Sequence, residues 1–187
     1  MNLDQILDCI YPLPLDAKSL LIPHIQLVQY KKGHILLKAN KVERMIYFIK
    51  KGIVHAYAEK GIDTVTFWIG REGEAILSMR SYVEDKPAYE HIELLEACEL
   101  YALNTTTLQT LFLQDIHIAN WGRKLAEQEL MKTEERLIAQ QFKTATERYK
   151  DLLALHPDLL QRVSLGKIAS YLGITQVSLS RIRADIR

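Results

Sequence analysis

The strongest chemical signal in the sequence is a run near the C-terminus whose residue types and spacing could bind DNA. Residues 164–183 read SLGKIASYLGITQVSLSRIR, which fits a helix, a tight turn and a second helix. Small Ala169 would let the two helices cross closely, and Gly173, four residues later, can adopt the positive φ of a sharp turn. Five apolar residues at helix-turn-helix spacing would join the helices: Ile168, Leu172, Ile174, Leu179 and Ile182.

The second helix of this pair has an outward face suited to the major groove. At 100° per residue, the face expected to be buried carries Thr175, Leu179, Ile182 and Ile186, while Thr175 could also cap the helix. The opposite face is short-chained, with Arg181 at its centre, and an arginine can bind the O6 and N7 atoms of guanine. We therefore predict DNA contacts from seven residues: Thr175, Gln176, Val177, Ser178, Ser180, Arg181 and Arg183.

The charge distribution agrees with DNA binding at this end of the chain. The 187 residues carry a formal net charge of +1. Residues 1–105 hold 12 Lys/Arg against 14 Asp/Glu, whereas residues 143–187 hold 8 against 4, a net charge of +4. A basic C-terminal segment that follows a near-neutral N-terminal part is what binding of a polyanion at the C-terminus needs. A structural helical hairpin with a solvated Arg181 is the alternative reading of the motif.

A long helix is expected to position this pair. No proline and only one glycine, Gly122, interrupt the segment from about residue 118 to 142. Its apolar residues lie on several sides, so several sides must be covered. We expect a second copy of the same helix to supply part of that cover, and burial within one subunit is the alternative. The faces comprise Ala119, Ala126, Leu130 and Leu137; Ile118, Trp121 and Leu125; and Met131, Ile138 and Phe142.

The first half of the chain predicts an antiparallel β-structure. Two short helices, up to about residue 15 and over residues 16–22, end at prolines. Eight short runs of β-formers follow with glycine at the turns, and one of them, residues 53–58, alternates as a half-buried strand with His55 outward. The predicted strands are residues 27–30, 34–38, 45–50, 53–58, 64–69, 75–78, 91–97 and 99–103.

The order of β-roll, long helix and helix-turn-helix resembles the Crp/Fnr family of bacterial transcription regulators. The resemblance covers about residues 20–187 and is carried by KGHIL at 32–36, IYFIKKG at 46–52, Gly73-Glu74, IASYLGIT at 168–175 and LSRI at 179–182. It implies a cyclic-nucleotide-binding-like sensory domain, a dimerisation helix and DNA as partner. Two-fold symmetry would set the two recognition helices about 34 Å apart on the duplex.

The family's phosphate-binding residues are not matched in this sequence. Members that bind cyclic AMP place a Gly-Glu pair and an Arg-Ser/Thr pair where this chain has Leu77-Ser78 and Ala88-Tyr89. The arginine is absent, and Arg80 lies at a different spacing. We therefore expect no standard cyclic AMP site, but a pocket for an unidentified small-molecule effector. Its predicted residues are Gly73, Glu74, Leu77, Ser78, Arg80, Ala88 and Tyr89.

The sequence lacks the motifs that other classes of function require. His34, His55 and His91 have no His-x-His pair with a following glutamate, and no nucleophile elbow or glycine-rich phosphate loop occurs. Two isolated cysteines can build neither a four-thiolate metal site nor a disulfide framework. No apolar run reaches the roughly 18 residues of a membrane span, and no signal peptide is recognisable. We expect no enzyme, no metal, no cofactor, no membrane partner and a cytoplasmic location.

The sequence thus predicts an α+β chain in three parts. Residues 1–115 would form the β-roll sensory domain, residues 116–142 the dimerisation helix, and residues 143–187 the helix-turn-helix domain. The expected function is a homodimeric, sequence-specific transcription regulator that binds double-stranded DNA. A ligand-sensing or protein-interaction module without DNA binding is the alternative.

Overall fold

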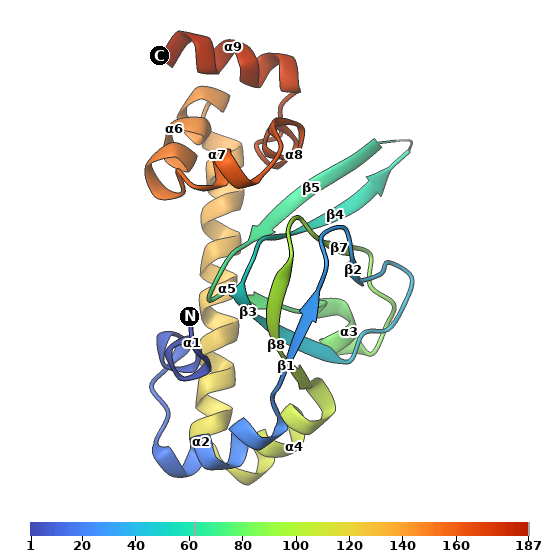
Figure 1. Cartoon of the computed structure of the whole chain (residues 1–187), viewed down its shortest axis with the longest axis vertical. Coiled ribbons are helices and arrows are strands. Elements are labelled where there is room, and N and C mark those ends of the chain that lie inside the picture. Colours follow the sequence, from blue (N-terminus) through green and yellow to red (C-terminus); the bar gives the residue numbers. More distant parts are fainter. Residues whose placement is uncertain (62, 187) are drawn as a thin grey trace.

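Two antiparallel sheets form a β-roll beside one long helix, α5 (Ile116–Phe142), in the computed structural model, which describes residues 1–61 and 63–186 (Figure 1). Each predicted strand overlaps a strand of the structure, although the strands predicted over 75–78 and 91–97 end earlier, at Ile76 and Leu94. The first sheet has the order β1 (Gln26–Tyr30), β8 (Cys98–Asn104), β3 (Met45–Lys51), β6 (Ala75–Ile76). The second has the order β2 (Ile35–Leu37), β7 (His91–Leu94), β4 (Val54–Lys60), β5 (Asp63–Gly70).

The other helices gather mainly at the two ends of α5 (Figure 1). The N-terminal ones are α1 (Leu3–Ile10), α2 (Leu15–Leu21) and the short η1 (Ile22–His24). Within and after the roll come α3 (Met79–Glu84) and α4 (Thr105–Gln114). The C-terminal ones are α6 (Ala145–Leu155), α7 (Leu159–Arg162), α8 (Leu165–Tyr171) and α9 (Gln176–Ile186). Side-chain caps begin α4 and α5, since Asn104 and Asp115 each accept two backbone N–H groups.

Strand β3 separates two apolar cores. Its side chains alternate, so that Ile46 and Phe48 pack with the N-terminal helices while Tyr47 and Ile49 pack between the two sheets. Both sets are buried, which explains why this strand is apolar at successive positions rather than at every second one. The first core therefore fixes α1 and α2 to the outer face of the first sheet.

Strand β4 differs from its prediction as a half-buried strand. Val54 and Ala56 face the inter-sheet core as expected, but His55 on the opposite face is also buried, with 2% of its surface exposed. The physical reason is tertiary packing: α8 lies against the neighbouring strand β5 and covers this face. Alternation along one strand does not show that a distant helix will cover its second face.

The two halves of α5 are buried differently. Near its start, Ile118 and Trp121 are fully buried, and the Trp121 Nε1 donates a hydrogen bond of 2.9 Å to the Leu7 carbonyl oxygen. The Trp121 ring also meets Phe48 edge-on at 5.8 Å between centroids. Toward its end, Leu130 and Phe142 are 69% and 79% exposed. At 1.5 Å per residue the helix is about 40 Å long, so its second half extends beyond the cover that the N-terminal helices provide.

Replacing Trp121 by Ala is expected to destabilise the fold by about 3–5 kcal/mol, because it empties a large core site and removes one of the two hydrogen bonds that the Leu7 carbonyl accepts. Urea unfolding followed by circular dichroism measures the change. Leu113→Ala on α4 is the control: that side chain is 90% exposed, and its removal should change the free energy of unfolding by no more than about 0.5 kcal/mol. Equal losses in the two variants would contradict this packing.

Candidate functional site

The turn between α8 and α9 is tight and hydrogen-bonded. Gly173 has φ +70°, the positive value expected for it from the sequence. The Gly173 N–H donates to the Ser170 carbonyl and the Ile174 N–H to the Ala169 carbonyl, both at 3.0 Å. Thr175 then caps α9, since its Oγ1 accepts the Ser178 N–H at 3.1 Å. These bonds fix the direction in which α9 leaves the turn.

One face of α9 is buried and the opposite face is open. Leu179 is fully buried against Ile168, Ala169 and Leu172, whereas Val177 is 62% exposed. The predicted buried face is corrected at Thr175, which is exposed. Thr175 precedes the first turn of α9 as its cap, so the helical angle used to place it does not apply there.

The residues predicted to contact DNA lie together on α9 and its cap, at the end of the molecule remote from the N-terminal helices (Figure 1). The side chain of Gln176 lies close to Gly166 on α8, where an added Cβ would be 3.3 Å from Gln176 Oε1. Among residues 1–61 and 63–186, no side chain buries this face. The exposed members are Thr175, Gln176, Val177, Ser180 and Arg181, and the half-buried ones are Ser178 and Arg183.

Arg148 on α6 holds the turn from behind, which sequence reasoning missed. Its Nε and Nη2 donate to the Leu172 carbonyl at 3.2 and 2.9 Å, and its Nη1 donates to the Lys143 carbonyl at 2.5 Å. A helix end leaves carbonyl groups without intrahelical partners, and a cation near it satisfies them. The sequence signal was only a basic residue on a helix, which does not show its partner.

The C-terminal helices share an apolar core with the roll. Ile53, Ile69 and Leu95 come from the roll, and the C-terminal helices supply Tyr149, Leu152, Leu159, Val163, Ile168, Ala169, Leu172 and Leu179. Leu179 of α9 packs in this cluster, and α8 packs on β5. Helix α9 is therefore connected to the roll through α8.

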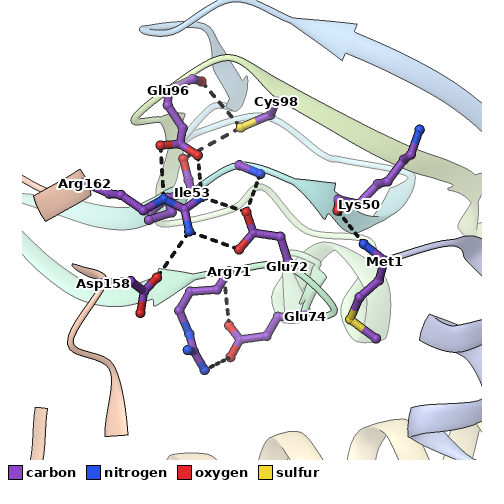
Figure 2. Close-up of polar contacts among 11 residues, drawn as sticks. Met1, Lys50, Ile53, Arg71, Glu72, Glu74, Glu96, Cys98, Asp158 and Arg162 are labelled. Carbon is purple, nitrogen blue, oxygen red and sulfur yellow. Dashed lines mark hydrogen bonds and ion pairs between the residues drawn. The ribbon is translucent and has the colours of Figure 1, made fainter. Parts of the chain in front are cut away.

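Arg162 on α7 reinforces this contact with charge (Figure 2). Its Nη2 lies 2.7 Å from Glu72 Oε1 and 2.5 Å from Glu96 Oε1, and its Nη1 lies 3.2 Å from Asp158 Oδ2. Glu72 also accepts the Gly52 N–H at 2.9 Å. One guanidinium thus connects two carboxylates of the roll to α7, and the bonds it makes are charge-assisted.

The titration of these groups reflects their contacts. Burial alone would raise the pKa of Glu72, but the hydrogen bonds from Arg162 and Gly52 outweigh it and lower that pKa to about 2. Hydrogen bonds to Glu96 and then Glu72 raise the pKa of Arg162. Burial, followed by the Glu96 and Glu72 charges, raises the pKa of the nearby Cys98 thiol to about 11. The ion pairs therefore persist, and the thiol stays protonated, across ordinary pH.

A second polar contact joins α8 to the roll around His55. Lys167 Nζ lies 2.8 Å from His55 Nε2 and 3.2 Å from Glu93 Oε2, while His55 Nδ1 lies 3.1 Å from Thr66 Oγ1. His55 Nε2 also lies 3.0 Å from Glu93 Oε2, so this atom is in contact with both a cation and a carboxylate. A neutral ring can accept from Lys167 at Nε2 while Nδ1–H donates to Thr66. Nearby, the Thr66 N–H donates to Ser170 Oγ at 2.9 Å. Protonation of His55 would remove that acceptor and add a charge against Lys167.

A cavity of about 560 Å³ lies between the roll, α5 and the end of α8. Its walls are mainly apolar, with three charged side chains, Glu90, Glu129 and Arg136, among the described lining residues. The roll contributes Phe67, Trp68, Ile76, Leu77, Tyr82 and Tyr89; the helices α4 and α5 contribute Leu108, Phe112, Leu125 and Leu137; and Ser170 and Gly173 come from the α8 region.

Of the residues predicted for an effector pocket, Leu77 and Tyr89 line this cavity. Gly73, Glu74, Ser78, Arg80 and Ala88 do not. Gly73 and Glu74 form a turn against β3, with Gly73 N–H donating to the Ile49 carbonyl at 2.8 Å. Ser78 and Ala88 are buried behind the lining, and Arg80 is exposed on α3. The sequence did not predict helix α3, which carries Arg80 outside the cavity.

The charged residues Arg136 and Glu90 line the cavity although neither was predicted. Among the residues that the structure describes, no cluster of His, Cys, Asp or Glu has the arrangement to hold a metal ion. Within those same residues, no helix combines the length and apolar character that a bilayer crossing requires.

Acid is expected to weaken the fold through His55. Burial, the largest cause, and the Lys167 charge lower the pKa of His55 despite Glu93. The unfolded chain therefore takes up this proton near pH 6.5 while the folded chain does not, so stability falls as the pH drops below about 6.5. Urea unfolding at pH 7.5 and 5.5 should show a smaller loss for His55→Gln than for wild type. His156, whose pKa is lowered by burial, supplies a loss common to both; equal losses would contradict the role of His55.

Comparisons with known proteins agree with this architecture. Residues 27–115 match the cyclic nucleotide-binding domain. FixK2 from Bradyrhizobium japonicum is 19% identical, with a TM-score of 0.74 over 87% of this chain and 84% of that one. The c-di-GMP-responsive global regulator CLP of Xanthomonas campestris is also 19% identical, with a TM-score of 0.70 over 92% and 91%. A protein from Eubacterium rectale described as a Crp/Fnr-family regulator is 16% identical, with a TM-score of 0.72 over 91% and 82%.

No curated protein matches the sequence. At these identities the solved structures establish a common fold. The resemblance found in the sequence is therefore confirmed at the level of the fold: residues 27–115 match the cyclic nucleotide-binding domain, and the chain has the fold that FixK2 and the Eubacterium rectale protein share.

Proposed function

We propose that this chain is a homodimeric, sequence-specific DNA-binding transcription regulator of the Crp/Fnr type. Residues 1–115 act as the sensory domain, residues 116–142 as the dimerisation helix and residues 143–187 as the helix-turn-helix domain. The observation that carries the proposal is the open face of α9, on which Val177 is 62% exposed and Arg181 is exposed beside it. Its opposite face is anchored by fully buried Leu179.

The chemistry of this face supports reading of base edges. Val177 offers a methyl surface for thymine, Gln176 an amide for adenine, and Arg181 a planar fork for guanine. The serines and the capping Thr175 have the short hydroxyl side chains that reach phosphate. Because α8, the turn and Arg148 hold the helix from behind, its side chains are pre-positioned for a groove.

Homodimer formation is supported by the second half of α5. Leu130 and Leu137 recur at seven residues, as do Met131 and Ile138, and all four are between 48% and 69% exposed. A helix that exposes apolar residues at this spacing has the pattern that pairs with a second helix. Pairing two copies along α5 would give the assembly two α9 helices related by a two-fold axis, matching a palindromic site.

Control by a small molecule is supported by the cavity beside α5, although a standard cyclic AMP site is not. The positions that supply the phosphate contacts in cyclic AMP-binding members are here Leu77-Ser78 and Ala88-Tyr89, and Arg80 points away from the cavity lining. We therefore assign the effector to a different chemical class. The proposal includes no catalytic step.

DNA binding should weaken steeply with salt. Gel shifts with pooled genomic fragments are expected to show log K falling linearly with log salt between about 50 and 200 mM, because phosphate contacts release counterions. Arg181→Ala should reduce the difference in binding free energy between the preferred fragments and the rest of the pool by about 1–3 kcal/mol. Arg44→Ala is the control, since Arg44 is exposed on the roll beside Asp85. Absence of any shift at low salt would contradict the proposal.

Dimer formation should depend on Leu130. Leu130→Glu is expected to shift the sedimentation coefficient toward the monomer, because each copy would place a carboxylate in the apolar contact. Lys132→Glu adds a carboxylate to the same helix about 200° away around its axis, and the dimer should survive it. A wild-type chain that sediments as a monomer at micromolar concentration would contradict the assembly.

A further inference from the structure

We propose that the cavity between the roll and α5 binds an apolar carboxylic acid, with Arg136 contacting its carboxylate. This inference rests on the proposed function only for the regulatory meaning of the ligand. Three features support the binding site independently of DNA binding: the size of the cavity, the chemistry of its walls and the surroundings of Arg136.

The walls favour a ligand with an apolar body. A volume of about 560 Å³ falls within the range of roughly 300–1,000 Å³ typical of small-molecule sites. Aromatic Phe67 and Trp68 of the roll and aliphatic Leu125 and Leu137 of α5 line it, together with Ile76, which also belongs to the inter-sheet core. Removing this surface from water favours a hydrocarbon or ring-bearing ligand over a sugar phosphate, whose polar groups would lack partners.

Arg136 is the residue that selects an anion. It is half-buried, and its guanidinium lies over the Tyr171 ring at 5.2 Å from the centroid. Among the described residues, no carboxylate lies within ion-pair distance of it. The Glu74 charge acts on Arg136 from a greater distance but makes no ion pair with its guanidinium, so a ligand carboxylate could bind the guanidinium with two parallel hydrogen bonds. Burial also lowers the pKa of Arg136, as expected for a cation whose solvation is incomplete.

The other charged lining residues indicate the ligand's orientation. Glu129 is already paired with Lys132, at 2.6 Å. Glu90 is only 5% exposed and accepts the Tyr89 N–H at 3.1 Å. A ligand carboxylate would be repelled by Glu90 and attracted by Arg136. The carboxylate therefore belongs at Arg136, and the uncharged body of the ligand extends toward the roll.

The position of Arg136 also connects the site to the DNA-contacting end of the chain. Tyr171, on which Arg136 stacks, belongs to α8, and Ser170 and Gly173 line the same cavity. A ligand bound to Arg136 would therefore touch the roll, α5 and the turn that leads into α9. This contact gives the ligand a direct means to favour one position of α9 over another.

Binding can be measured on the full chain without DNA. Titration of decanoate should change the fluorescence of Trp68, because this side chain lines the cavity. The other tryptophan, Trp121, is fully buried and does not line the cavity, so its emission should stay constant. Decyltrimethylammonium has the same chain with the opposite charge, and 1-naphthoate tests a ring-bearing body. We expect at least one carboxylate to bind and the ammonium compound to bind at least tenfold more weakly. Tighter binding of the ammonium compound, or no binding of either carboxylate, would overturn the proposal.

Arg136→Gln is expected to weaken carboxylate binding at least tenfold, while Arg136→Lys retains part of it. Arg80→Gln is the matched control, because Arg80 is exposed and outside the cavity, and it should leave the affinity unchanged. Circular dichroism checks that each variant is folded, and the wild-type comparison of charges needs no variant. Unchanged affinity in folded Arg136→Gln would overturn the proposal. Gel shifts run separately distinguish the two failures: DNA binding without carboxylate binding refutes this inference alone, and carboxylate binding without DNA binding refutes the proposed regulator.

Discussion

The contact between α8 and the roll is the constraint on which the rest of the molecule depends. Ile53, Ile69 and Leu95 of the roll are buried with the apolar residues of the C-terminal helices in one cluster. Arg162 adds ion pairs to two carboxylates of the roll, and Lys167 adds a contact to His55. Because apolar packing and charge act on the same joint, α7 and α8 cannot change their position relative to the roll without disturbing both.

This joint connects the cavity to α9, the helix with the exposed face. The cavity is lined by the roll, by α5 and by Ser170 and Gly173, so its contents bear on the segment that orients α9. The joint is strong in charge but modest in apolar area on the roll side, where three residues contribute. In the regulator proposed above, a ligand would act by favouring one arrangement of this joint over another.

The sequence was sufficient for elements whose pattern is local. Glycine turns and β-formers predicted the strands, and Gly173 with its apolar neighbours predicted the turn between α8 and α9. It was insufficient wherever a distant partner decides: His55 is buried by α8, and α3 moves Arg80 out of the cavity while Arg136, from α5, enters it. A side chain's periodicity specifies its face, but the packing of remote elements determines what covers that face.

The most direct test of the account is selection of bound sequences from a pool of random duplexes by the purified full chain. The account predicts enrichment of a two-fold symmetric sequence whose half-sites are about 10 base pairs apart, centre to centre, as two α9 helices on one face of the duplex require. A pool that stays random after repeated rounds, or that yields a single unrepeated half-site, would contradict it.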